Sequence, residues 1–207
     1  MTSDTPLNIA YIVLYFFAAV TRAPYARAAR ALPVRAHRRR RTETLLLVPV
    51  SFGLMILPLV AVFSPWLDRY EMGLPMWARV LGLVGFAGAV TTHGWTHREL
   101  AANWSPVLEI RENHCLVTTG PYRLVRHPMY AGFLLWAWSQ GLTLSNWLVL
   151  VAGVASFAIM YLARVGHEEA LLREAFGAEY NAYVSRTGRL FPSRRKSSCW
   201  GRERDCS

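Results

Sequence analysis

The chain is organised around one polar segment, Gly120-Pro121-Tyr122-Arg123-Leu124-Val125-Arg126-His127-Pro128-Met129-Tyr130-Ala131-Gly132, which directly precedes an apolar stretch. We refer to residues 120–132 as the collar. Gly120-Pro121 predicts a turn, and the residue before a proline is disfavoured in helical conformation, so His127 should be extended while Pro128 opens a helix. The His127 side chain and the free N–H groups of that helix should then face one place, which would suit a carboxylate. The alternative is that the collar has no binding role and only lies at the membrane interface, with its tyrosine and arginine side chains at the depth of the lipid headgroups.

The composition is that of a membrane protein. Hydrophobic residues make up 53% of the 207 residues and occur in blocks. The net charge of +10 would favour nucleic-acid binding in a soluble protein, but here the basic residues lie between apolar blocks and are better explained by loops that face anionic lipid. The three cysteines, Cys115, Cys199 and Cys206, have neither an even number nor metal-ligand spacing, so they predict no disulfide framework and no zinc site.

Five apolar blocks predict an all-α, polytopic membrane protein with about five transmembrane helices. The blocks cover residues 7–25, 45–63, 76–92, 129–144 and 147–163. Only Ser145-Asn146 separates the last two, which should therefore form a tight antiparallel hairpin. From Arg164 onward the pattern predicts a separate amphipathic helix on the membrane surface, interrupted at Gly177.

Two of these blocks contain residues that affect helix geometry. Pro49 and Pro58 predict kinks in the second span, which transmembrane helices tolerate when neighbours satisfy the freed carbonyls. Small residues recur along one face of the third span, which should pack closely against protein rather than lipid. They are Gly82, Gly85 and Gly88. From His93 to Arg126 the chain is polar and should lie on the cytoplasmic surface.

The distribution of basic residues predicts the orientation. With five spans, the basic stretches around 22–41, 98–126 and 173–194 fall on one side of the membrane. The positive-inside rule then places the N-terminus outside, and the C-terminus and the collar in the cytoplasm, in a bacterial inner membrane. We expect a three-span region over residues 1–92, a cofactor-binding and catalytic region over 93–192, and a disordered basic tail over 193–207.

The collar and a second group of residues together resemble the isoprenylcysteine carboxyl methyltransferase family. The second group, about one helical hairpin later, is Glu168-Glu169, Phe176-Gly177-Ala178-Glu179-Tyr180 and Tyr183. The resemblance covers residues 103–192 and rests on both motifs at this separation. The His-Pro-x-Tyr segment by itself also occurs in phospholipid N-methyltransferases and in membrane-embedded sterol reductases.

This resemblance implies an integral-membrane methyltransferase that uses S-adenosyl-L-methionine. It assigns Glu168 as the acidic cofactor ligand and Arg164 as the residue that binds the substrate carboxylate, with Glu109 as a guess for a further polar contact. The remaining cofactor-binding residues that it implies are His114, Cys115, Leu116, Val117, Tyr122, His127, Pro128, Met129 and Tyr130.

The chemistry of methyl transfer fits these residue types. Transfer from a sulfonium is an in-line displacement with an activated leaving group, so the protein mainly positions the reactants. A carboxylate nucleophile is already ionised at pH 7. Arg164 and Glu168 share a helix face at i,i+4, and guanidinium matches a carboxylate; an ordinary salt bridge between them is the alternative. Glu169 should face away from Glu168 as a solvated charge.

Other functions stay open at this point. The acceptor could be the carboxylate of an isoprenylcysteine-like substrate or another lipophilic or lipid-attached isoprenoid, thiol or amine, which would include a phospholipid N-methyltransferase. From other classes, an NADPH-dependent lipid reductase or a non-catalytic membrane scaffold is possible. His93 and His97 have an i,i+4 spacing that can bind zinc, but no third ligand is evident, so we expect no metal. Beyond the acceptor, only membrane lipids are expected as partners, and no nucleic acid.

Overall fold

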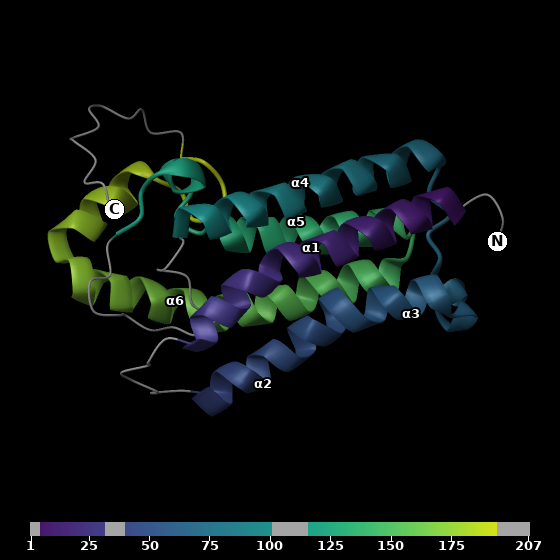
Figure 1. Ribbon diagram of the computed structural model, residues 1–207, viewed down its shortest axis with the longest axis horizontal. Helices are drawn as coiled ribbons and strands as arrows, with labels where there is room; N and C mark the ends of the chain where they lie inside the picture. The colour runs from purple at the N-terminus through teal and green to yellow at the C-terminus, as the bar shows by residue number, and fades with distance from the viewer. Residues whose placement is uncertain (1–4, 32–39, 101–115, 194–207) are drawn as a thin grey trace.

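The computed structural model describes residues 5–31, 40–100 and 116–193, and all regular elements in these ranges are helical, as predicted. The helices run roughly along one axis as an elongated bundle (Figure 1). In chain order they are α1 (Thr5–Ala31), α2 (Arg40–Ser51), the π-helix η1 (Phe52–Ile56), α3 (Leu57–Phe63), the 3₁₀ helix η2 (Pro65–Tyr70), α4 (Met76–Leu100), the 3₁₀ helix η4 (Gly120–Arg123), α5 (Pro128–Thr143) and α6 (Trp147–Arg186).

Three helical segments among the described residues are long and apolar enough to cross a membrane. They are Pro6–Tyr25, Leu45–Phe63 and Trp147–Arg186. The first two coincide with the first two predicted spans. α5 has only 16 residues, fewer than the roughly 20 that a perpendicular crossing needs. The membrane character is therefore clear, whereas the number of five spans stays a prediction.

The irregularity predicted for the second span takes the form of a π-helical segment between Pro49 and Pro58. A proline has no N–H to donate, so the regular ladder of hydrogen bonds cannot continue through this region. The carbonyl of Gly53 in this segment accepts a hydrogen bond from Gln140 Nε2 on α5 at 3.3 Å. A side chain of a neighbouring helix thus supplies a hydrogen bond to a backbone carbonyl that water cannot reach in the apolar surroundings.

α4 and α5 approach each other through the glycine face predicted for the third span. A Cβ atom on Gly82 would lie 2.6 Å from the backbone N of Thr143, and one on Gly85 would lie 2.5 Å from Ser139 Oγ. The prediction that this face packs against protein is confirmed. α4 continues to Leu100, so the helix extends eight residues past the predicted third span; the position of residues 93–100 at the cytoplasmic surface stays a prediction. No proline interrupts them, and two of their polar side chains lie against the bundle: His93 Nδ1 is 2.8 Å from the Ala89 carbonyl, and the buried His97 ring stacks on Tyr25.

The last two helices form the predicted hairpin. Ser145 has φ 52°, and Asn146 caps α6 by accepting a hydrogen bond from Val149 N at 3.1 Å while its amide donates to the Leu67 carbonyl at 2.8 Å. The prediction that a separate amphipathic helix begins at Arg164 is wrong, because α6 continues through this position without a break. No proline lies in this part of the sequence, and Gly166 is tolerated within the helix. At Gly177 (φ 50°, ψ −117°) the backbone leaves helical geometry, where the interruption was expected.

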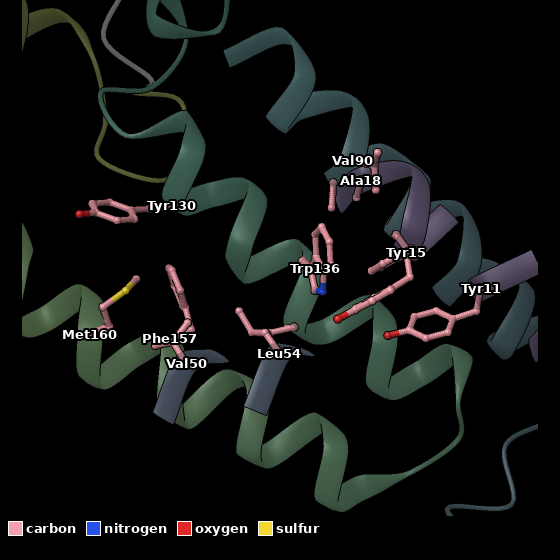
Figure 2. Close-up of a cluster of buried hydrophobic side chains, with 13 residues drawn as sticks. Tyr11, Tyr15, Ala18, Val50, Leu54, Val90, Tyr130, Trp136, Phe157 and Met160 are labelled. Atoms are coloured by element: carbon pink, nitrogen blue, oxygen red, sulfur yellow. The ribbon is translucent and has the colours of Figure 1, made fainter. Parts of the chain in front are cut away.

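The core gathers residues from α1, the α2–η1 region, α4, α5 and α6 (Figure 2). Its polar centre is Gln140, which is fully buried and accepts hydrogen bonds from Trp136 Nε1 at 3.0 Å and from the Tyr11 hydroxyl at 3.4 Å. Buried amides are stable only when their hydrogen-bonding capacity is used. Gln140 therefore ties three helices together and fixes how α5, which begins at the collar, sits in the bundle.

Candidate functional site

The collar, the end of α4 and the second half of α6 meet at one end of the bundle, at the left in Figure 1. Gly120 has φ +54°, and a Cβ there would overlap the Glu99 carboxyl group, so only glycine fits this turn. Glu99 accepts a hydrogen bond from Thr119 Oγ1 at 2.8 Å. The end of α4 thus fixes the start of the collar, a contact that the sequence reasoning missed.

Within the collar, His127 is the last residue before α5 and Pro128 begins this helix, as predicted. The backbone of His127 lies outside the helical region (φ −124°, ψ 63°), which is what a following proline favours. The segment after α6 runs alongside: Arg126 N donates to the Gly188 carbonyl at 2.8 Å, and His127 N donates to the Arg189 carbonyl at 3.0 Å. The imidazole does not cap the backbone of α5 but faces two carboxylates on α6.

Glu168 is the first of these carboxylates. It accepts a hydrogen bond from the Tyr130 hydroxyl at 2.8 Å, and its Oε1 lies 3.6 Å from His127 Nδ1. Its side chain is 28% exposed, so it retains access to a ligand. Arg164 lies one turn earlier on α6 and is buried, and its charge acts on the Glu168 carboxylate. The structure therefore brings together His127, Tyr130, Glu168 and Arg164, all predicted from the sequence.

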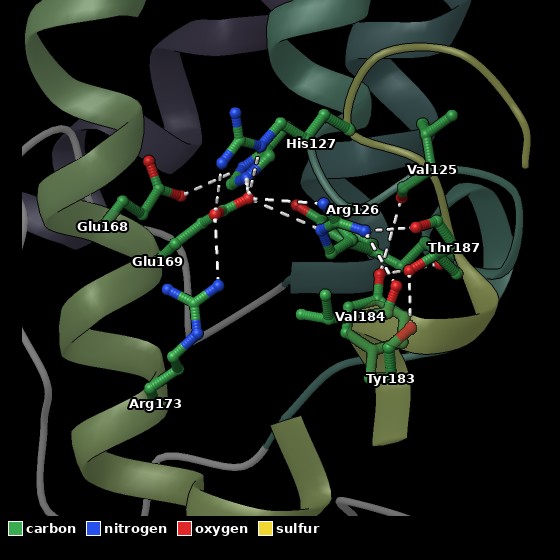
Figure 3. A network of polar contacts seen from close by, with 11 residues as sticks. Val125, Arg126, His127, Glu168, Glu169, Arg173, Tyr183, Val184 and Thr187 are labelled. Carbon is green, nitrogen blue, oxygen red and sulfur yellow. Dashed lines mark hydrogen bonds and ion pairs between the residues drawn. The ribbon is translucent and has the colours of Figure 1, made fainter. Parts of the chain in front are cut away.

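Glu169 is the second carboxylate, and the prediction that it is a solvated charge is wrong. Its side chain is only 1% exposed. Arg189 donates to it twice, from Nε at 3.0 Å and from Nη2 at 2.8 Å. Arg126 Nε, Arg173 Nη2 and His127 Nε2 lie 3.4–3.5 Å from its oxygens (Figure 3). Burial of a carboxylate requires such pairing, and here the collar, α6 and the following segment all supply it.

Burial and charge act in opposite directions on His127. Burial disfavours the imidazolium, but hydrogen bonds to Glu168 and Glu169 outweigh it and raise the pKa of His127 above its ordinary value of 6.5. Each ring nitrogen faces a carboxylate, which suits the doubly protonated ring. Burial also raises the pKa of Tyr122 well above 10.0, so its phenol stays neutral. Tyr183 secures this turn by donating to the Tyr122 carbonyl at 2.7 Å.

Aromatic rings form an apolar wall beside Glu168. The Tyr130 and Tyr161 rings are 5.4 Å apart edge to face, and the Tyr161 and Phe157 rings are 6.0 Å apart and stacked. A partly exposed carboxylate can accept hydrogen bonds from a ligand's cationic group or hydroxyls, and the neighbouring rings offer a surface for a flat heterocycle. The residues present therefore fit the cofactor that the sequence resemblance implies.

The other predicted cofactor residues divide into two groups. Leu116 and Val117 lead into the collar and are partly buried, Pro128 is buried, and Met129 is partly buried at the start of α5. His114, Cys115 and Glu109 lie outside the described residues. Among the residues that the structure describes, no group of three His, Cys, Asp or Glu side chains could hold a metal ion.

Sequence reasoning missed the residues that surround Glu169. Arg126 also donates from Nη1 to the Val184 carbonyl at 3.1 Å and to the Thr187 carbonyl, so it ties the collar to the end of α6. The available signal was charge: an arginine stands directly before His127, a second glutamate follows Glu168, and Arg189 follows the last helix.

Comparison with known proteins identifies relatives of this chain. Residues 77–179 match the family model described as phospholipid methyltransferase. The chain is 33% identical over 159 residues to a probable protein-S-isoprenylcysteine O-methyltransferase of Oryza sativa subsp. indica, covering 72% of this chain and 80% of the relative. It is 31% identical over 131 residues to protein-S-isoprenylcysteine O-methyltransferase B of Arabidopsis thaliana, covering 60% of this chain and 62% of that protein.

The fold also matches a solved structure, that of the eukaryotic intramembrane Ras methyltransferase ICMT. The TM-score is 0.53 at 23% sequence identity, and the match covers 76% of this chain and 54% of that chain. This chain therefore spans about half of that solved chain, and the likeness concerns the fold. These matches do not favour a reductase or a scaffold. The chain belongs to the isoprenylcysteine carboxyl methyltransferase family and is a membrane methyltransferase.

Proposed function

We propose that this protein transfers a methyl group from S-adenosyl-L-methionine to the carboxylate of a lipophilic acceptor, an isoprenylcysteine-like or other isoprenoid compound. The observation that carries the proposal is the pair of opposite charges on one face of α6: the partly exposed carboxylate of Glu168 and, one turn earlier, the buried guanidinium of Arg164. One charge suits the cofactor and the other suits an anionic acceptor.

On the cofactor side, Glu168 would hold the ammonium or the ribose hydroxyls of S-adenosyl-L-methionine. When bound, this cofactor supplies a methyl group on a sulfonium leaving group. The Tyr130 hydroxyl, at 2.8 Å from Glu168 Oε2, keeps the carboxylate in one rotamer, and His127 limits its movement from the other side. The ring of Tyr161, which contacts the Tyr130 ring edge to face at 5.4 Å, would limit the access of water to it.

On the acceptor side, Arg164 would bind the carboxylate that receives the methyl group. Its guanidinium is always charged and offers a planar pair of donors that matches a carboxylate. Because Arg164 is buried, the acceptor carboxylate loses part of its hydration when it pairs there, which makes it a better nucleophile. The protein then contributes position and partial desolvation, and no proton transfer is needed.

The test is methyl transfer by the detergent-purified protein, with radiolabelled S-adenosyl-L-methionine and an N-acylated S-isoprenylcysteine as acceptor. Arg164→Ala should abolish transfer to the carboxylate while binding of S-adenosylhomocysteine persists, and Arg164→Lys should restore part of it. Arg186→Ala removes an exposed arginine of the same helix and is the matched control.

Phosphatidylethanolamine is the second acceptor to be tested, because the matching family model is described as phospholipid methyltransferase. Transfer to this amine that does not depend on Arg164 would replace the carboxylate proposal with a phospholipid N-methyltransferase. Absence of S-adenosylhomocysteine binding, or binding of NADPH instead, would refute a cofactor site of this kind.

The proposal includes a five-span topology with the N-terminus outside and the collar and C-terminus in the cytoplasm of a bacterial inner membrane. The support is the clustering of basic residues on the side of the collar, which includes Arg123, Arg126, Arg173, Arg186 and Arg189. A C-terminal fluorescent-protein fusion that folds only in the cytoplasm should be fluorescent. A dark fusion at normal protein level would contradict this orientation.

A further inference from the structure

Glu169 is surrounded by more positively charged groups than an ordinary surface ion pair contains. Three guanidinium groups and one imidazole, from three separate segments, converge on this one carboxylate. Arg126 comes from the collar, Arg173 from the next turn of α6, and Arg189 from the segment after α6. The side chains of Glu169 and Arg126 are 1% and 9% exposed, so neither can exchange its partner for water at small cost.

The same carboxylate controls the ring that faces Glu168. His127 Nε2 lies 3.4 Å from Glu169 Oε1, and His127 Nδ1 lies 3.6 Å from Glu168 Oε1. Because the imidazole is planar and rigid, holding Nε2 also fixes the direction of Nδ1. The backbone of His127 is held as well, by its N–H bond to the Arg189 carbonyl, and the Arg189 side chain ends on Glu169.

We propose that Glu169 is a positioning residue for the cofactor side of the site: it orients His127 toward Glu168 and anchors the Arg189 segment against the collar, without contacting the cofactor. The inference rests on the proposed function, because it assumes that Glu168 holds the cofactor. Glu169 does not need ligand access, which agrees with its 1% exposure against 28% for Glu168.

The negative charge of Glu169, and not only the shape of its side chain, should be required to orient His127. Glutamine has nearly the same volume, but its neutral amide cannot balance Arg126 and His127, and its NH₂ group would face cationic donors. The ring of His127 should then lose its fixed orientation. The side chains of Arg173 and Arg189 are about half exposed, at 46% and 52%, and can turn to water, so most of the effect should reach the site through His127.

The experiment is isothermal titration of the purified full-length protein with S-adenosylhomocysteine. The variants are Glu169→Gln, His127→Asn and the double variant, with Glu174→Gln, an exposed glutamate of the same helix, as the matched control. Glu169→Gln should raise Kd about tenfold, a change of about 1.4 kcal/mol, with unchanged stoichiometry. The double variant should bind no more weakly than His127→Asn alone, because both changes act through one ring.

Other outcomes would contradict the proposal or the function on which it rests, and Arg189→Ala is measured as well to tell them apart. A fall in stoichiometry with unchanged Kd would mean that Glu169 only stabilises the fold, and it would overturn the proposal. Equal Kd for Glu169→Gln and wild type, or fully additive effects in the double variant, would overturn it too. If Arg189→Ala reproduced the whole effect while His127 showed no coupling, the route through the ring would be wrong. Failure of the wild-type protein to bind S-adenosylhomocysteine would refute the proposed function instead.

Discussion

Replacing Gly82 by alanine should weaken the contact between α4 and α5, on which the position of the collar depends. The added Cβ would lie 2.6 Å from Thr143 N, 2.8 Å from Thr143 Oγ1 and 2.9 Å from Leu142 Cβ. The first obstacle is backbone, so a rotamer change cannot relieve it and the two helices must separate. That movement also disturbs the bond from buried Arg79 Nε to the Thr143 carbonyl, now 3.0 Å.

The magnitude follows from two opposing effects. Overpacking against an immobile neighbour costs about 1–3 kcal/mol, and the upper end applies where backbone is met. Alanine gains about 1 kcal/mol over glycine in helix propensity. The free energy of unfolding of Gly82→Ala should therefore fall by about 2 kcal/mol.

The control is Gly94→Ala, on the same helix, where an added Cβ meets no atom within 4 Å. That variant keeps the propensity gain and should be as stable as wild type or more stable. Unfolding of both variants in mixed detergent, followed by tryptophan fluorescence, measures the difference. Equal stability of Gly82→Ala and Gly94→Ala would refute the close packing of α4 on α5.

Three further predictions concern the end of the bundle that carries the site. The pKa of His127 is raised in the folded protein, so the stabilisation from its charged ring should be complete below pH 6.5 and lost as the pH rises through the raised pKa. His127→Asn should therefore flatten the dependence of the free energy of unfolding on pH above pH 6.5. An unchanged dependence would exclude the charged ring. Gly177→Ala should lower the free energy of unfolding by about 1–3 kcal/mol through backbone strain alone, because a Cβ there meets no atom within 4 Å but φ is 50°. Thermal unfolding measures the change, and an unchanged unfolding temperature would show that the backbone relaxes. Tyr183→Phe should lower the free energy of unfolding by about 1 kcal/mol, because it removes the 2.7 Å hydrogen bond to the Tyr122 carbonyl. Tyr25→Phe makes the same exchange outside the collar and serves as the control.

Local signals predicted the turns and helix starts correctly. Gly120-Pro121 and His127-Pro128 restrict the backbone whatever surrounds them, so the 3₁₀ turn and the start of α5 could be read from the sequence. The hairpin at Ser145-Asn146 followed from the short spacing of two apolar blocks. The glycine face of α4 was also predictable, because close helix contacts require small residues at helical spacing.

Features that depend on tertiary contacts were not predictable in the same way. Helical periodicity places Glu168 and Glu169 about 100° apart, which suggested that one is solvated. The segment after α6 returns beside the collar and brings Arg189 to Glu169, and no local rule predicts that return. The continuation of α4 to Leu100 and of α6 past Arg164 was missed for a related reason: polarity marked the end of the apolar block, whereas a helix ends only where its backbone can no longer continue.

The uninterrupted course of α6 has a consequence for where the reaction takes place. A helix rises about 1.5 Å per residue, so Arg164 lies about 26 Å and Glu168 about 32 Å along the axis from Trp147. The hydrocarbon layer of a bilayer is about 30 Å thick. With Trp147 at one edge of this layer, and with the roles proposed above, α6 would place the guanidinium of Arg164 just inside the hydrocarbon and the carboxylate of Glu168 at its opposite edge. The proposed lipophilic acceptor and the proposed water-soluble methyl donor would then meet at one point, the first approaching from the bilayer and the second from water.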